Sequence, residues 1–124
     1  MTGARLYLSI GLGGGLGTGL RVALSFMALI YLPELVYLAT LLANVLGAAL
    51  IGYLATRALT AGQKAFWMTG FCGGFTTFSL FSLEIVTLAE RSVTEALVYG
   101  SASLVLWMLA AWGGWRIGKG RSIT

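Results

Sequence analysis

The chain has 124 residues, of which 58% are hydrophobic and only 10% are charged, with a net charge of +4 at pH 7. Soluble domains carry about 25% charged residues, so this composition excludes an ordinary soluble domain. Histidine and aspartate are absent. Their absence removes the usual residues of hydrolytic and metal-dependent enzymes, and we expect no enzyme. Cys72 is the only cysteine, so no disulfide within the chain and no cysteine-based metal cluster can form.

Four apolar segments are long enough to cross a membrane, since a spanning helix needs roughly 20 apolar residues. They cover approximately residues 6–30, 35–55, 65–89 and 96–115. Short breaks separate them, so sequential helices should be antiparallel neighbours. We expect one four-helix transmembrane domain over residues 1–124, in the cell membrane. The basic residues stand mostly at segment edges, which does not favour nucleic-acid binding.

Small residues recur inside these segments. Gly11, Gly15 and Gly19 are spaced every four residues in the first segment, and Gly47 and Gly52 lie in the second. Small residues at such spacing let helix backbones approach closely in lipid, so we expect these glycines to pack helices together. Four short helices enclose little interior, and we therefore also expect an oligomer.

Polar side chains within the apolar segments are costly in lipid and tend to mark function. Arg21 lies late in the first segment, where it either reaches the membrane interface or lines a wet vestibule that attracts anions. Asn44 lies near the middle of the second segment, with Thr40 one turn before it. Its amide either makes an interhelical hydrogen bond or belongs to a polar stripe. Glu84 lies late in the third segment, and we expect it to reach the interface.

The stretch GFCGGFTTFSLFS, residues 70–82, interrupts the third apolar segment. Its glycines, Gly70, Gly73 and Gly74, favour a break in the helix at membrane depth. Such a break is tolerated only where the backbone is buried in protein or lines a watery cavity. Its freed carbonyls can bind a cation, and the N-terminus of the half-helix that follows favours an anion.

Hydroxyls and aromatic rings follow the glycines of this stretch. Phe78 and Phe81 are three residues apart and should share a helix face. Ring edges carry partial positive charge, so edges beside hydroxyls and an amide suit a small anion. The alternative is that both rings pack against lipid or a neighbouring helix. The hydroxyls belong to Thr76, Thr77, Ser79 and Ser82.

The stretch closely resembles the signature GxxGGxTTFSTF of the Fluc (CrcB) fluoride channels. The likeness extends over the whole chain, with GLGTGLR at residues 15–21 and ANVLGAALIG at residues 43–52. The resemblance implies an all-α membrane protein of four transmembrane helices, with the third interrupted mid-membrane. It also implies an antiparallel dimer with two pores that passively exports fluoride from the cell.

The same resemblance implies roles for individual residues. The main-chain carbonyls of Gly73 and Thr76 would bind a structural Na+ at the two-fold axis of the dimer. Phe78 and Phe81 would present their ring edges to fluoride. The whole fluoride pathway would comprise Asn44, Phe78, Phe81, Thr77, Ser79, Ser103 and Arg21.

The chain departs from the family pattern at two places. Leu80 stands where a threonine is usual in the signature. In the fourth segment Tyr99 and Ser103 share a face, but the next two positions along it are Trp107 and Ala111. The family usually places hydroxyls along this face. Either the pore is lined differently here, or this chain contributes an incomplete one.

The charges at the segment ends predict an orientation. Four spans place both termini and the loop over residues 57–64 on one side of the membrane. Cytoplasmic loops carry the excess of Lys and Arg, so this side should be mainly cytoplasmic. An antiparallel dimer then pairs the chain either with an inverted copy of itself, which the resemblance favours, or with an inverted homologue. The basic residues on the side of the termini are Arg5, Arg57, Lys64, Arg116, Lys119 and Arg121.

Two other functions remain open. The chain could be a non-conducting or partly conducting subunit of a heterodimeric fluoride channel, for which tight helix packing would suffice. A small multidrug transporter also has four short helices, but it needs an acidic residue embedded in its first helix. The first segment contains no acidic residue, which disfavours the transporter.

Overall fold

The computed structural model describes residues 2–121, and every regular element in that range is helical. Three long helices are continuous: α1 (Gly3–Tyr31), α2 (Tyr37–Leu54) and α6 (Val93–Gly120). The remaining span is built from α3 (Ala61–Gln63), the π-helical η2 (Lys64–Cys72), α4 (Gly73–Phe75) and α5 (Phe78–Arg91). A 3-10 turn, η1 (Pro33–Leu35), joins α1 to α2.

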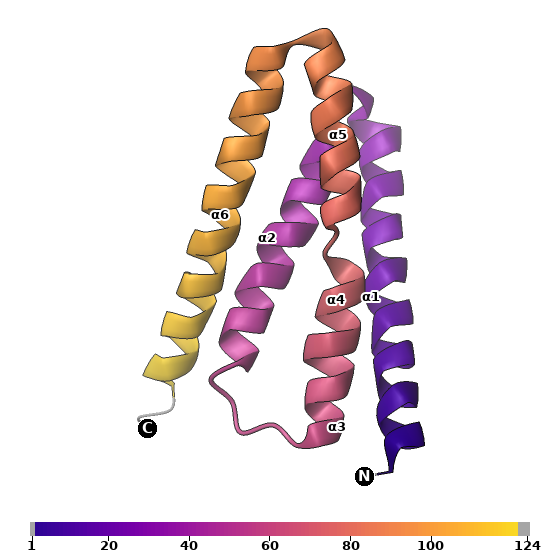
Figure 1. Cartoon of the computed structure of the whole chain (residues 1–124), viewed down its shortest axis with the longest axis vertical. Helices are drawn as coiled ribbons and strands as arrows, with labels where there is room; N and C mark the ends of the chain where they lie inside the picture. Colours follow the sequence, from indigo (N-terminus) through magenta and orange to yellow (C-terminus); the bar gives the residue numbers. More distant parts are fainter. Residues whose placement is uncertain (1, 122–124) are drawn as a thin grey trace.

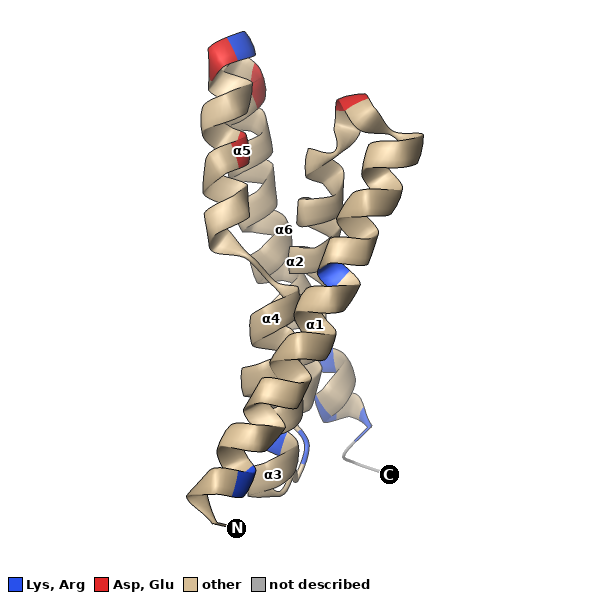
Figure 2. Cartoon of the chain, turned by 90° about the vertical axis from the view of Figure 1, so that its right-hand side faces the viewer, with Lys and Arg blue, Asp and Glu red and all other residues tan. Residues whose placement is uncertain are grey.

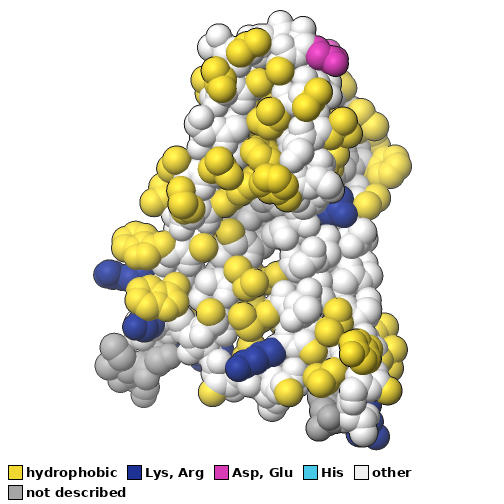
Figure 3. Space-filling model, in the orientation of Figure 1, with side chains coloured by type: hydrophobic (Ala, Val, Ile, Leu, Met, Phe, Trp, Pro, Cys, Tyr) yellow, Lys and Arg dark blue, Asp and Glu magenta, His cyan; other side chains and the backbone are white. Residues whose placement is uncertain are grey.

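Four helical stretches are long and apolar enough to cross a membrane: Gly3–Tyr31, Tyr37–Leu54, Ala61–Arg91 and Val93–Gly120. The prediction of an all-helical protein with four candidate spans is therefore confirmed. The start of α1 and the end of α6 lie at the same end of the bundle as the connection between α2 and α3 (Figure 1). Lysines and arginines gather mainly toward that end, while the acidic residues lie in the opposite half (Figure 2). Hydrophobic side chains are spread over the face of the bundle that Figure 3 shows.

Glycines bring α1 directly against the third span. A Cβ atom at Gly13 would collide with the carbonyl of Phe66, and one at Gly17 with the carbonyl of Phe71. Only glycine permits this backbone approach, which is the packing mode of small residues in lipid. The predicted stripe of Gly11, Gly15 and Gly19 has no described atom within 4 Å of its Cβ positions. The contact face of α1 is therefore offset by two residues from the one we expected.

The seam between α2 and α6 is equally close. A Cβ atom at Gly52 would collide with the carbonyl of Ala111, and one at Gly114 with the carbonyl of Ala49. The two backbones therefore touch over the half of α6 that leads to its C-terminus. In the other half, larger side chains fill the space, and Phe81, Leu88, Ala96 and Tyr99 form a buried cluster.

The chain reverses direction between α5 and α6 at a single residue, Ser92. Its extended backbone (φ −157°, ψ 113°) ends α5, and its hydroxyl accepts a hydrogen bond from the N–H of Glu95. Arg91 and Glu95 form an ion pair across this turn. The tight reversal makes α5 and α6 antiparallel neighbours, as the short break predicted.

Candidate functional site

The third span leaves the helical path at Thr76 and Thr77. Thr76 (φ −85°, ψ 155°) and Thr77 (φ −150°, ψ 122°) are extended, between α4 and α5. The glycines that we expected to break the helix lie before this point and are helical. A Cβ atom at Gly70 would meet the carbonyl of Ile10, so this glycine serves the packing against α1.

The carbonyls just before the break lose the donors that a continuous helix would supply. In an α-helix the N–H of residue i+4 bonds the carbonyl of residue i. The N–H of Thr77 instead donates to Oδ1 of Asn44 at 2.7 Å, away from Gly73. The N–H of Leu80 donates to Oγ1 of Thr77 at 3.2 Å, away from Thr76. The carbonyls of Gly73 and Thr76, the two predicted cation ligands, are among those released.

Asn44 braces the break from α2. Besides accepting from the Thr77 N–H, its Nδ2 donates to the Thr77 carbonyl at 3.0 Å. The side chain is only 5% exposed. The interhelical hydrogen bond that the sequence allowed is therefore present, and it satisfies the Thr77 N–H, which has no helical acceptor. One N–H of the amide remains for another acceptor.

Arg21 braces the same break from α1. Its Nε donates to the carbonyl of Gly74 at 3.2 Å, and Oγ1 of Thr18 donates to the same carbonyl at 3.3 Å. The guanidinium is thus turned toward the break and not toward the end of α1. This positive charge at the end of α4, together with the N-terminus of α5 that follows the break, makes the region favourable for an anion.

Phe78 and Phe81 lie next to each other just after the break, as their spacing predicted. Their ring centroids are 5.5 Å apart, with the planes tilted by 54°. Phe81 is buried, with contacts to the rings of Tyr99 at 5.6 Å and Trp107 at 4.7 Å. Phe78 is 67% exposed within the single chain. One ring is held inside the chain, and the other stands free on its surface.

The predicted hydroxyls are placed differently from one another. Oγ of Ser79 lies 3.3 Å from Oγ1 of Thr77, at the start of α5. Ser103, on α6, is completely buried, and its Oγ has no hydrogen-bond partner within residues 2–121. The structure therefore groups Ser79 with the break and leaves Ser103 apart, on α6.

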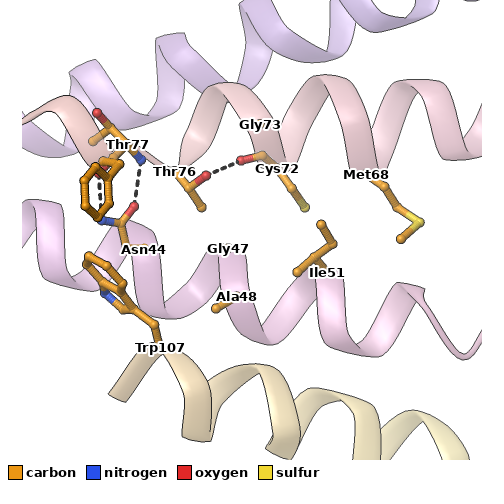
Figure 4. A pocket seen from close by; sticks show the side chains of 11 residues that line it. Asn44, Gly47, Ala48, Ile51, Met68, Cys72, Gly73, Thr76, Thr77 and Trp107 are labelled. Atoms are coloured by element: carbon orange, nitrogen blue, oxygen red, sulfur yellow. Dashed lines mark hydrogen bonds between the residues drawn. The ribbon is translucent and has the colours of Figure 1, made fainter. Parts of the chain in front are cut away.

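A cavity of about 300 Å³ opens beside the break, between α2 and the third span. Asn44, Thr77 and Trp107 gather at one end of it, and Met68 lies toward the other (Figure 4). Gly73 also lines it. Because no described atom lies within 4 Å of a Cβ atom at Gly73, the main chain is open to an approaching group here.

The expectation that Glu84 reaches the interface is wrong. Its two carboxylate oxygens accept hydrogen bonds from the hydroxyls of Thr40 at 2.6 Å and Tyr99 at 2.7 Å. These donors come from α2 and α6 and draw the half-buried carboxylate inward. Thr40 already stood out beside Asn44 in the sequence. The signal that could have found this cluster was therefore the helical spacing of Thr40 and Asn44 on α2.

Comparison with known proteins identifies the family. Residues 8–115 match the model of the family described as CrcB-like protein, Camphor Resistance (CrcB). The chain is 39% identical to the fluoride-specific ion channel FluC of Flavobacterium psychrophilum, over 89% of this chain and 94% of that protein. It is 37% identical to the FluC of Paracoccus denitrificans, over 92% and 94%. It is 43% identical to FluC 2 of Bacillus cereus over shorter shares, 65% and 70%. The chain belongs to the CrcB-like family and is a multi-pass integral membrane protein.

Proposed function

We propose that this chain forms a fluoride channel through which fluoride leaves the cell passively. The observation that carries the proposal is the break at Thr76 and Thr77, held by Asn44 on one side and Arg21 on the other. Such a site combines hydrogen-bond donors, positive charge and aromatic ring edges. None of the side chains that hydrogen-bond to the break is acidic. These groups suit a small anion. The relatives named as fluoride-specific channels support the same choice.

We place the break near the middle of the membrane. Thr76 lies fifteen residues from Ala61 and fifteen from Arg91, the two ends of the third span. Irregular backbone at this depth needs burial in protein or a wet cavity, and the cavity beside Asn44 meets that need. The fluoride pathway then comprises Asn44, Thr77, Phe78, Ser79, Phe81 and Ser103, with Arg21 supplying positive charge.

The working unit in this proposal is an antiparallel dimer with a structural Na+ at its two-fold axis. The carbonyls of Gly73 and Thr76 are the candidate ligands, because their usual helical donors bond elsewhere. Unwound carbonyls of this kind coordinate Na+ in other membrane proteins. Two oxygens are few for a cation, and a second copy related by the axis would supply two more. The exposed ring of Phe78 would meet that second copy.

A second candidate is a partly conducting subunit paired with an inverted homologue. The observation that favours it is the face of α6, where Trp107 and Ala111 replace the expected hydroxyls. The concentration of basic residues at the end with the termini points the same way (Figure 2), because it favours one orientation.

Efflux from liposomes tests the proposal. The purified chain is reconstituted in vesicles loaded with fluoride or with chloride, and release is followed with ion-selective electrodes. We expect rapid release of fluoride and almost none of chloride, with protein-free vesicles as the control. Fluoride release only after co-reconstitution with an inverted homologue would favour the second candidate. No fluoride release in either case would reject both.

A further inference from the structure

Two polar groups on the face of α6 have no hydrogen-bond partner within residues 2–121. They are the hydroxyl of Ser103 and the indole N–H of Trp107, both closed off from solvent. The two residues lie one helical turn apart, so their side chains share a face. Buried donors in proteins are almost always paired, and an unpaired one calls for an explanation such as an ion.

Aromatic contacts place both groups beside the ring pair of the candidate site. The ring of Phe81 contacts the rings of Tyr99 and Trp107. These two residues lie one turn before and one turn after Ser103 on α6. The contact with Trp107 is edge-to-face, at 4.7 Å and 69°. Trp107 also lines the cavity that contains Asn44 and Thr77 (Figure 4). Trp107 therefore borders the cavity, whereas Ser103 is not among the residues that line it.

Beyond this point, α6 packs its main chain directly against α2. One turn after Trp107, the carbonyl of Ala111 fills the position that a Cβ atom at Gly52 would need. Further along α6, the carbonyl of Ala49 on α2 fills the position that a Cβ atom at Gly114 would need. Main chains this close leave no room for an ion between them. An ion that follows the face of α6 toward this seam would therefore leave it near Trp107, which lines the cavity.

We propose that the indole N–H of Trp107 is a hydrogen-bond donor to the permeating anion, in the position where a hydroxyl would otherwise serve. This inference rests on the proposed fluoride channel. An indole N–H can donate but cannot accept, so it binds an anion and offers nothing to a cation. Its shielding from water strengthens the bond, because hydrogen bonds are electrostatically stronger at low local dielectric. Ser103 supplies the neighbouring donor on the same face.

The first test compares two tryptophan variants in the liposome assay. Trp107→Phe keeps an aromatic ring but removes the N–H, and we expect fluoride efflux to fall by at least about tenfold, equivalent to about 1.4 kcal/mol. Trp112→Phe is the matched control on the same helix, because this side chain is 57% exposed, and we expect no change. Efflux from Trp107→Phe equal to or faster than that of the parent would overturn the proposal. Faster efflux would indicate that the ring of Trp107 obstructs the fluoride pathway.

The second test observes the N–H directly and does not depend on transport. The chain is labelled with 15N-tryptophan, and the Trp107 indole resonance is identified by its loss in Trp107→Phe. If that variant does not fold, single Phe variants of the other three tryptophans assign the resonance by elimination. We expect sodium fluoride to shift this resonance and sodium chloride to leave it unchanged. If fluoride does not shift the Trp107 resonance, the inference is wrong. If the parent chain shows no fluoride efflux, the proposed function is wrong instead.

Discussion

Asn44 and Thr77 are joined by a pair of hydrogen bonds in which one side chain of α2 gives the Thr77 N–H the acceptor that a continuous helix would have supplied. The amide donates to the Thr77 carbonyl at 3.0 Å and accepts from the Thr77 N–H at 2.7 Å. The break in the third span is therefore a bonded structure and not a frayed one. Its shape depends on a residue more than thirty positions earlier in the chain.

Removing this brace should destabilise the chain and slow transport. For Asn44→Ala we expect a loss of about 1–2 kcal/mol, because two interhelical hydrogen bonds are lost and each contributes about 0.6–2 kcal/mol in membranes. Thermal stability in detergent and fluoride efflux should both fall. Thr87→Val is the control, since its hydroxyl bonds only the carbonyl of Leu83 in its own helix. Equal stability of Asn44→Ala and the control would show that the break keeps its conformation without the hydrogen bonds from Asn44.

The ring pair should matter for fluoride because of its edges. Phe78→Ile keeps an apolar side chain but removes the ring, and we expect a loss of efflux of at least about tenfold with the dimer intact. Phe78 is the cleaner site, because Phe81 is buried and its replacement also disturbs packing. Phe26→Ile, at an exposed position on α1, should conduct like the parent. Normal efflux from both Phe78→Ile and Phe81→Ile would show that the two rings contribute only to packing and do not contact fluoride.

The sodium ion should depend on main-chain geometry at Thr76. Thr76→Ser keeps the hydrogen bond from this hydroxyl to the carbonyl of Cys72, so we expect nearly normal dimerisation and efflux. Replacing sodium by a large organic cation should lower both, because the carbonyls of Gly73 and Thr76 would then face each other unneutralised across the axis. Dimer content is measured by crosslinking in the two salts. A dimer that is indifferent to sodium would contradict the proposed ion.

The same substitution should destabilise the chain at one glycine of α1 and be tolerated at another. Gly17→Ala puts a Cβ atom into the carbonyl of Phe71, and we expect a loss of about 1–3 kcal/mol from overpacking. Gly15→Ala meets no described atom within 4 Å, and the folded chain should be retained. Heating followed by size-exclusion chromatography compares the two. Equal losses would mean that α1 packs through a different face.

Labelling of a cysteine near the C-terminus should reveal the orientation of the chain. Gly120→Cys in a Cys72→Ser background is suitable, since position 120 is exposed and open around its Cβ position. For an antiparallel homodimer we expect an impermeant reagent to label about half of the chains in intact cells and the rest after permeabilisation. Labelling only after permeabilisation would mean a single orientation and an inverted homologue as the partner.

The sequence by itself determined the four spans, their approximate limits and the neighbourhood of the break. Runs of apolar residues and short polar breaks are local features, and so are the spacings of Phe78 and Phe81 or of Thr40 and Asn44. The resemblance of residues 70–82 to one family also lies in the order of residues, and the comparisons confirm that family.

Only the tertiary structure decided what the individual small and polar residues do. Gly70 looks like a helix breaker, yet it is helical and admits the backbone of α1. Glu84 looks like an interface residue, yet Thr40 and Tyr99 hold it inside. The physical reason is the same in both cases. Whether a glycine breaks a helix or packs against one, and whether a carboxylate turns outward or inward, depends on the groups that a neighbouring helix brings within reach.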